Sequence, residues 1–267
     1  MSTIGKKRLS KINNVLCAYG IDLITFIHSV RGTNSYIKDY FHFKKQLKRN
    51  NKSVKVNFYP CMADRYDFAG TAKGHYFHQD LLVAQKVFIN NPKKHVDIGS
   101  RIDGFVAHVA SYREIEVLDI RPISDSFNKN VKFRCVDLMD DNLDLINYCD
   151  SLSCLHAMEH FGLGRYGDNI DYFGYIKGFN NMYKILQKEG ILYLSVPIGP
   201  QRIEFNAHRV FSVSTLLSLI KGKFEIISFS YVNDHGDLVT NPEFNKNNID
   251  TNFGCNYGCG IFELRKL

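Results

Sequence analysis

The sequence contains no apolar run long enough to cross a membrane. Its most apolar early stretch, residues 9–30, is interrupted by polar side chains that include Lys11 and Asp22. The basic residues 6–8 in front of it resemble the start of a signal peptide, but neither a continuous apolar core nor a small-residue cleavage site follows. We therefore expect a cytoplasmic protein without stable membrane insertion.

A disulfide framework is also missing. The seven cysteines are odd in number and scattered along the chain, a pattern that argues against a small secreted domain held by disulfides. The two closest, Cys255 and Cys259, have no second pair at the spacing of a zinc motif. We expect reduced thiols.

The turn after the strand predicted at residues 95–98 lacks the Gly-x-Gly-x-x-Gly pattern of a dinucleotide site, and the chain has no internal repeat. An acidic balance is absent too, because the formal net charge is +7. That charge favours an acidic partner, such as a phosphorylated metabolite, a sugar nucleotide, nucleic acid or an anionic membrane. A solvated lysine-rich face at residues 44–55 explains part of the excess equally well.

What the sequence does contain is enough apolar material, 45% of 267 residues, for one sizeable core and an appendage. After Pro92, predicted strands alternate with helices, which is typical of a mostly parallel sheet covered on both faces. These strands are expected at residues 95–98, 114–119, 131–136, 150–155, 191–196, 224–232 and 260–264. Before residue 74 we expect helices on either side of a break at residues 31–35, and a short strand at residues 54–59.

Three acidic residues follow three consecutive strands of this pattern: Asp97, Asp119 and Asp137. The carboxyl ends of parallel strands meet at one edge of a sheet, where such folds bind ligands. Asp119 lies 22 residues after Asp97, the spacing expected for a carboxylate that accepts hydrogen bonds from a ribose diol. Asp137 is placed to receive an exocyclic amine while Leu138 covers the ring.

The first turn of the helix predicted near residues 75–90 is unusually polar and aromatic, with His75, Tyr76, His78, Gln79 and Asp80. Capping and surface polarity explain part of this composition. The alternative is a flap whose hydrogen-bond donors reach a ligand in the cleft.

Together these motifs resemble those of class I S-adenosylmethionine-dependent methyltransferases. Asp97-x-Gly99 resembles the first motif, residues 151–160 the fourth strand with its Glu-His ending, and residues 188–197 the fifth-strand motif. The resemblance implies a Rossmann-like α/β fold with a mostly parallel seven-stranded sheet, helices on both faces and an antiparallel last strand. Residues 74–267 would form this domain, and residues 1–73 an N-terminal helical cap or a homodimer contact.

The resemblance further implies S-adenosylmethionine as the cofactor. In the first motif, Ser100 and Arg101 replace the usual small residues, and Arg101 becomes a candidate ligand for the methionine carboxylate. The cofactor contacts that we expect are Asp97, Gly99, Ser100, Arg101, Asp119, Ile120, Asp137, Leu138 and His156, with Tyr76, His78 and Gln79 from the flap.

A narrower resemblance involves Asp64-Arg-Tyr, residues 159–168 and Asn206-Ala-His-Arg209. These segments are similar to a methyltransferase-like family from bacterial capsule and polysaccharide loci, some of whose members resemble enzymes that methylate a capsule phosphoramidate. It implies O-methyl transfer to a small acidic acceptor that contains phosphate, or to a sugar nucleotide.

Such a transfer is an SN2 attack on a sulfonium, so the enzyme chiefly aligns the nucleophile and manages its proton. A hydroxyl acceptor needs a base, whereas an anionic phosphate oxygen needs only positioning. The candidate catalytic residues are His208, His156, Arg209 and Glu159. His156 could equally be a loop histidine bonded to backbone, and His160 a packing residue. Arg209 and Arg165 suit an acidic acceptor. Some sugar methyltransferases that resemble this fold use magnesium, and this resemblance makes Asp168, Asp171 and His160 candidate ligands, but no spacing requires a site and we expect no metal.

Two other functions fit parts of the sequence. The charge of +7 is compatible with a nucleic-acid methyltransferase, although the Asn/Asp-Pro-Pro-Tyr/Phe signature and a Pro-Cys nucleophile pair are both missing. The alternative is a non-catalytic scaffold that kept the cofactor-binding fold and is recruited to an assembly by its N-terminal helices.

Overall fold

The computed structural model describes residue 13, residues 15–123 and residues 129–267. The chain divides into two compact units, with the boundary between Thr71 and Ala72. The beginning of the first predicted helix, together with the basic residues 6–8, lies outside the described residues. Among the residues that are described, no helix combines the length and the hydrophobicity needed to cross a bilayer.

The N-terminal unit is built on one long helix, α2 (Leu23–Arg49). Asp22 caps it by accepting hydrogen bonds from the backbone amides of Ile24 and Thr25. The break predicted at residues 31–35 is wrong, because the helix runs through it. Gly32 serves a close contact instead, since a Cβ at this position would lie 2.1 Å from the carbonyl oxygen of Met62.

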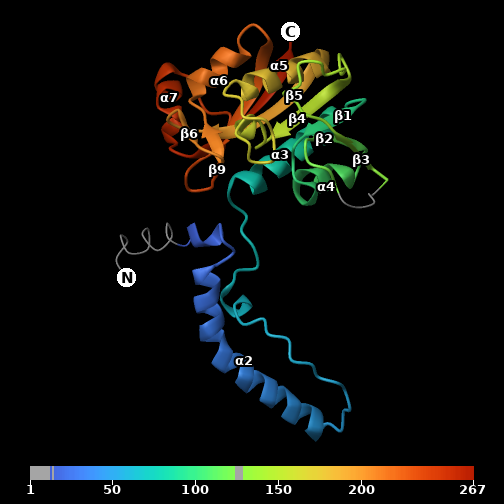
Figure 1. The fold of residues 1–267 in the computed structure, drawn as a ribbon, viewed down its shortest axis with the longest axis vertical. Helices are drawn as coiled ribbons and strands as arrows, with labels where there is room; N and C mark the ends of the chain where they lie inside the picture. Colours follow the sequence, from blue (N-terminus) through green and yellow to red (C-terminus); the bar gives the residue numbers. More distant parts are fainter. Residues whose placement is uncertain (1–12, 14, 124–128) are drawn as a thin grey trace. The chain divides into compact units, whose positions relative to one another are not determined.

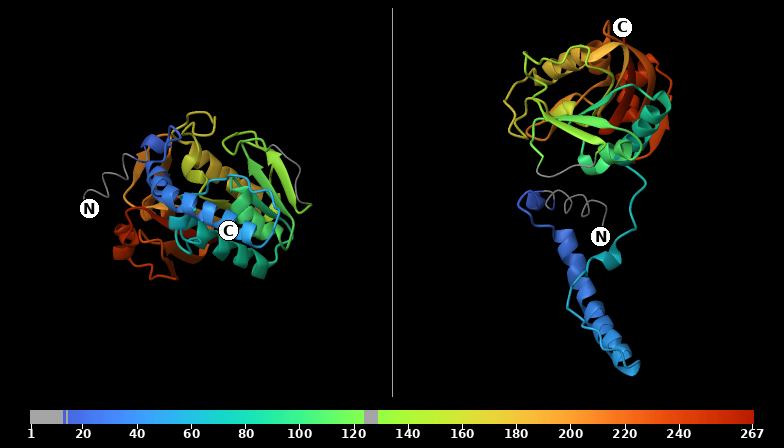
Figure 2. Two further views of the ribbon diagram at one scale, coloured as in Figure 1. Left: turned by 90° about the horizontal axis from the view of Figure 1, so that it is seen from below. Right: turned by 90° about the vertical axis from the view of Figure 1, so that its right-hand side faces the viewer.

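Residues 51–71 run back along α2 without forming a strand, as Figures 1 and 2 show. The strand predicted at residues 54–59 is therefore wrong. Its aromatic residue Phe58 packs on the helix, with ring centroids 5.0 Å from Tyr36 and 5.5 Å from Tyr40. The short helix η1 (Asp64–Tyr66) follows, and its Arg65 forms an ion pair with Asp39 of α2.

The second unit contains a sheet with the strand order β3-β2-β1-β4-β5-β10-β8-β9. The first five strands are parallel, and β10 is antiparallel to both of its neighbours. The expected Rossmann-like α/β fold with an antiparallel last strand is thus confirmed. The strands are β1 (His95–Ile98), β2 (Ile115–Asp119), β3 (Val131–Cys135), β4 (Cys149–Leu155), β5 (Leu186–Ile198), β8 (Phe224–Val232), β9 (Leu238–Thr240) and β10 (Gly258–Lys266).

Two details of this sheet differ from the prediction. Within the described residues it has eight strands rather than seven, because β9 pairs with the end of β8 as an added edge strand. In addition, β5 begins at Leu186, which pairs with Cys149 before an irregularity in the register. A separate hairpin, β6 (Arg202–Glu204) and β7 (His208–Val210), follows β5.

Helices cover both faces of the sheet (Figure 1). On one face, α3 (His75–Asn90) and α4 (Ala107–Ala110) bury Val83, Val87 and Val109. On the other face, α5 (Gly174–Ile185) and α6 (Val213–Ile220) bury a larger core that includes Phe179 and Leu216. The shorter helices are η2 (Ile102–Val106), η3 (Met158–His160), α7 (Lys246–Asp250) and η4 (Asn252–Gly254).

Candidate active site

The turn after β1 depends on Gly99. Its φ of 70° lies in the left-handed region that favours glycine. A Cβ there would also stand 3.0 Å from the Cβ of Ala157, which follows β4. The Gly99 amide donates to the carbonyl of Leu118 at 2.9 Å, so the turn is fastened to the neighbouring strand. Glycine thus leaves backbone exposed to a ligand at the carboxyl edge of the sheet.

Asp97 lies behind this turn. It is fully buried and accepts hydrogen bonds from Ser100, through the amide at 3.0 Å and the hydroxyl at 2.8 Å, and from the Ser153 hydroxyl at 2.5 Å. Burial raises the pKa of Asp97 to about 7, although the hydrogen bonds from Ser153 and Ser100 act in the opposite direction. Its carboxylate therefore holds the turn from inside and does not line the cleft.

Arg101 points elsewhere as well. This exposed guanidinium forms two hydrogen bonds with Asp103, at 3.0 and 2.7 Å, and does not line the cleft. The helix that follows begins with the π-type turn η2, where Gly104 has φ −114° and ψ −116°. The prediction that Arg101 binds a carboxylate gains no support from this geometry.

Asp119, at the end of β2, is directed into the cleft but has a partner there. Its two oxygens accept from the Arg121 guanidinium at 3.0 and 2.6 Å, and the Arg121 amide adds a third hydrogen bond at 2.8 Å. The guanidinium carbon of Arg121 lies 4.3 Å from the centre of the Tyr166 ring. Sequence reasoning overlooked both Arg121 and Tyr166.

The cleft itself runs along the ends of β1, β2 and β3 beside the end of β4 and has about 530 Å³ of empty space. It brings together six of the predicted cofactor contacts: Gly99, Asp119, Ile120, Asp137, Leu138 and His156. Leu118 and Leu138 give it an apolar floor, while the Asp137 carboxylate accepts from the Met139 amide at 2.8 Å.

The first turn of α3 contributes to a second pocket. The rings of His75 and Tyr76 lie 5.1 and 5.2 Å from the ring of His156. Gln79 is buried, and its Oε1 accepts from the Ser195 hydroxyl of β5 at 2.5 Å. His78, one turn further along α3, lines neither pocket.

This second pocket has about 830 Å³ of empty space. Its lining is rich in imidazole and contains His75, Tyr76, His156, Glu159, His160, Arg165, His208 and Tyr257. His156 and His160 also line the first cleft. The two pockets therefore adjoin at these histidines.

His156 directly follows β4 in a strained backbone conformation, with φ 51°. Its Nδ1 lies 2.6 Å from Oε1 of Glu159, and both side chains are buried. Burial opposes ionisation of His156, but the Cys259 sulfur and the Glu159 carboxylate outweigh it and raise its pKa well above the usual value. For Glu159, burial raises the pKa, while the stronger opposing effect of His156 leaves it lowered.

The remaining polar residues of the pocket fall into two groups. His160 is held by the Ala207 carbonyl, 2.6 Å from its Nδ1, so it serves the backbone while it lines both pockets. His208, at the start of β7, is half-buried and has no such bond; its ring lies 5.2 Å from that of Tyr257. Burial lowers the pKa of His208. Burial and the neighbouring His156 together lower the pKa of His75 to about 4.

Arg209 does not take the predicted catalytic position. It is only 2% exposed, and its guanidinium donates to the carbonyls of Phe161 at 2.6 Å and Tyr172 at 3.2 Å. Its guanidinium carbon also lies 4.9 Å from the Tyr175 ring centre. An acceptor phosphate cannot reach these nitrogens, so Arg209 acts as a clamp between two loops. The sequence placed it in an acceptor loop because it follows β5, yet β7 turns the side chain inward.

The three residues considered for magnesium do not form a site. Asp168 accepts from the amides of Gly162 and Gly164 within its own loop, and Asp171 pairs with Lys177 at 2.9 Å. Their carboxylates thus stabilise the loop between η3 and α5.

The chain matches the model of one protein family, and its fold is similar to those of several solved structures. The model of the family described as Caenorhabditis protein of unknown function, DUF268, matches residues 107–254. No curated protein matches the sequence.

Several solved structures align with most of the chain at low identity. A 1,6-didemethyltoxoflavin-N1-methyltransferase from Burkholderia thailandensis is 13% identical, with a TM-score of 0.49 over 70% of this chain and 78% of the other. The N-methyltransferase NodS from Bradyrhizobium japonicum is 11% identical, with a TM-score of 0.47 over 79% and 93%. A putative sarcosine dimethylglycine methyltransferase from Galdieria sulphuraria is 14% identical, with a TM-score of 0.49 over 70% and 83%.

Proposed function

The chain belongs to the family described as Caenorhabditis protein of unknown function, DUF268, and we propose that it transfers methyl groups from S-adenosylmethionine. The observation that carries this proposal is the junction of two unlike pockets at His156 and His160. A group-transfer enzyme needs a donor site and an acceptor site that meet at the reacting atoms.

The cleft at the ends of β1, β2 and β3 is suited to the adenosine part of the donor. Asp119 would accept hydrogen bonds from the ribose hydroxyls, and Asp137 from the adenine amine, above the apolar floor formed with Leu138. Arg121 already occupies the oxygens of Asp119. An ionised carboxyl group has about four lone-pair positions, so it can bind a diol and retain part of this ion pair.

The backbone turn at Gly99 and the histidines at the junction mark the place for the sulfonium. Its methyl group would then face the second pocket. During transfer the bond from the acceptor oxygen to the methyl carbon forms while the sulfur–methyl bond breaks, and the sulfonium becomes a neutral thioether. The residues of the chain therefore align the acceptor and remove its proton.

The acceptor that we propose is a small acidic molecule, methylated on oxygen. The second pocket presents Arg165 and several imidazoles but, among the residues that line it, Glu159 alone is acidic, and that carboxylate is engaged by His156. Within the part of the chain that the structure describes, no hydrogen bond occupies the ring of His208, which is our candidate general base for a hydroxyl acceptor. A phosphate oxygen would need no base. Capsule or surface-polysaccharide synthesis, including phosphoramidate methylation, is the narrowest form of this proposal and rests on sequence motifs alone.

Binding of S-adenosylhomocysteine, measured by titration calorimetry, tests the donor site. We expect wild-type protein to bind it and Asp119→Asn to weaken binding about 10–100-fold, because a hydrogen bond to a charged group contributes about 1.5–3 kcal/mol. The matched control is Asp144→Asn, which changes an exposed carboxylate outside both pockets. No binding by the wild type, or equal loss in both variants, would reject the proposal.

A further inference from the structure

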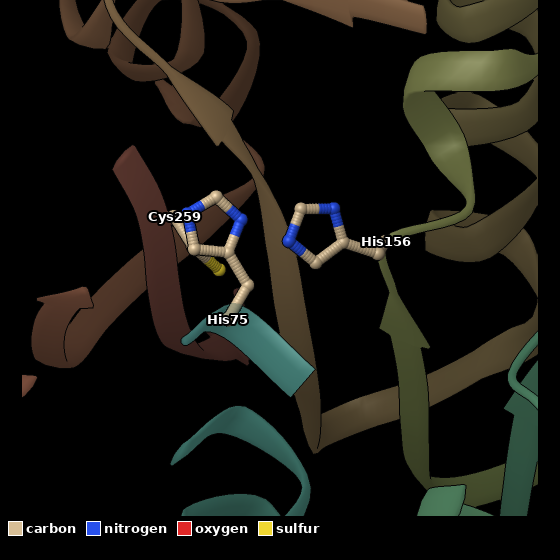
Figure 3. A group of neighbouring side chains, drawn as sticks. All are labelled: His75, His156 and Cys259. Carbon is tan, nitrogen blue, oxygen red and sulfur yellow. The ribbon is translucent and has the colours of Figure 1, made fainter. Parts of the chain in front are cut away.

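Three side chains from distant parts of the second unit point to one place. His75 begins α3, His156 follows β4, and Cys259 lies on β10 (Figure 3). One ring nitrogen from each histidine and the Cys259 sulfur all lie within 4.8 Å of one another. In the part of the chain that the structure describes, this is the one group of at least three histidine, cysteine or acidic side chains with such spacing.

Two residues of the group are buried, His75 is partly buried, and the group has an unused ligand atom. His156 is 8% exposed and Cys259 is fully buried. Among the described residues, Nε2 of His156 is buried without a hydrogen-bond partner, although Nδ1 of the same ring is bound to Glu159. An unpaired buried nitrogen is unfavourable, because it loses its hydrogen bond to water and gains none in the protein. A ligand at this position would remove that cost.

The surroundings already orient the two imidazoles. Nδ1 of His156 faces the Glu159 carboxylate, so a metal that displaces the proton of Nε2 would find the lone pair of that nitrogen directed at the group. A carboxylate behind a histidine is the usual outer support of a metal-binding imidazole. The backbone of Tyr257 hydrogen-bonds to His75. The two rings lie parallel, with an angle of 5° between their planes, so both present an edge to the same space.

Ordinary packing explains these residues less well. The Cys259 sulfur donates to Oε1 of Gln79 at 3.8 Å and to the Gly260 carbonyl at 4.0 Å, both long distances, and it also interacts with His156. Cys255, four residues earlier, is a buried thiol too, yet it does not belong to the group. Burial of a thiol in this fold therefore does not explain why two histidines surround Cys259.

We propose that His75, His156 and Cys259 bind a zinc ion, with Glu159 as the residue that positions His156. Two imidazoles and a thiolate match the preference of zinc for nitrogen and sulfur ligands, at about 2.0–2.1 and 2.3 Å. In a tetrahedral site the ligand atoms would be about 3.5 Å apart. Small side-chain rotations close the remaining gap, since His75 lies in the first turn of its helix. Cys259 would lose its proton on binding.

Three protein ligands leave a fourth position open, as in catalytic zinc sites. Because His75 and His156 line the second pocket, this position faces the proposed acceptor. An anionic acceptor oxygen could bind there, and this last step alone rests on the proposed function. The sequence could not reveal the site, because His75 and Cys259 are 184 residues apart.

The test uses the full chain, freed of metal by a chelator and titrated with Zn²⁺ and, separately, with Co²⁺. We expect one equivalent of zinc to bind, and cobalt to give the absorption of a tetrahedral site with a thiolate-to-metal band. Cys259→Ser and His75→Ala should weaken zinc binding at least 100-fold, and Glu159→Gln about 10–100-fold. Matched controls are Cys255→Ser, the neighbouring buried thiol, and His78→Ala, one turn further along α3.

The cobalt spectrum of the wild type needs no variant, so a variant that fails to fold does not decide the result. Absence of the thiolate band, retention of zinc by Cys259→Ser, or equal loss in both control variants would overturn the zinc site. Binding of S-adenosylhomocysteine to the metal-free protein is measured separately, so that failure of the zinc site and failure of the proposed methyl transfer are distinguishable.

Discussion

The two adjoining pockets of this protein are built from opposite chemistry. The cleft at the ends of β1, β2 and β3 combines the carboxylates of Asp119 and Asp137 with an apolar floor. The pocket beside it is lined by imidazoles, tyrosines and the Arg165 guanidinium. The first suits a ligand with hydroxyl and amine donors, and the second an anionic or metal-bound one. Since His156 and His160 belong to both, a molecule in each would meet there.

His208 lines the second pocket but not the first. Its removal should therefore reduce methyl transfer without changing cofactor binding, and this is the largest difference that we expect between the two pockets. We expect His208→Ala to lower transfer to a hydroxyl acceptor about 10²–10⁴-fold, the usual contribution of a general base. Affinity for S-adenosylhomocysteine should not change. Labelled cofactor and fractionated metabolites supply the assay, and His235→Ala, an exposed histidine outside both pockets, is the control. Unchanged turnover would remove His208 from the site.

The same residue predicts a pH profile. A base must be neutral to accept a proton, and burial lowers the pKa of His208 below its usual 6.5. Among the groups around it, Glu159 and Glu204 raise that pKa, while His160 and Arg165 lower it. Transfer should therefore be at its plateau at pH 7 and decline only below pH 6.5. A midpoint above 6.5 would contradict this role.

Arg209 lines neither pocket. Its replacement should therefore affect the stability of the fold and not the affinity for either ligand. Removing the Arg209 guanidinium leaves the buried carbonyls of Phe161 and Tyr172 without their donor, which should cost about 1–3 kcal/mol of the free energy of unfolding for each carbonyl. Arg209→Ala and Arg209→Lys should both melt at lower temperature, since lysine cannot reach the Phe161 and Tyr172 carbonyls together. A stable Arg209→Ala variant that loses only acceptor affinity would restore Arg209 as a ligand.

The pH dependence of stability tests whether Asp97, buried behind the first cleft, has a structural role. Its pKa is raised to about 7 from 3.8, so its contribution to stability is full below pH 4 and is lost as the pH rises through 7. The total loss should be about 4 kcal/mol, because each pKa unit corresponds to about 1.4 kcal/mol, and about 3 kcal/mol of it should fall between pH 5 and pH 8. Asp97→Asn should remove this loss. Chemical denaturation of both proteins at pH 5, 6, 7 and 8 measures it, and parallel curves would contradict the burial argument.

The sequence predicted most where local pattern determines structure. Strands alternate with helices along the chain, so the fold could be inferred from the sequence. The same pattern predicted that Asp97, Asp119 and Asp137 each come at the end of a strand or just after it. Directions of side chains could not be inferred, because they depend on distant contacts. Asp97 is turned inward by Ser153, and Arg209 is drawn in by loop carbonyls. The cluster of His75, His156 and Cys259 arises only when α3, β4 and β10 come together.

The same limit explains the two errors in the N-terminal unit. Gly32 reads as a helix break, yet the helix needs it to let Met62 approach. The alternation at residues 54–59 reads as a strand, yet it packs aromatic rings on α2. The role of this unit as a cap or homodimer contact stays a prediction.

A crystal structure of the complex with S-adenosylhomocysteine tests the central claim most directly. We predict the ribose hydroxyls within hydrogen-bond distance of Asp119, the adenine between Asp137 and Leu138, and the sulfur beside Gly99 at the junction with His156. Electron density for the ligand at any other place, or a saturated crystal with Asp119 and Arg121 still closed over an empty cleft, would contradict the account.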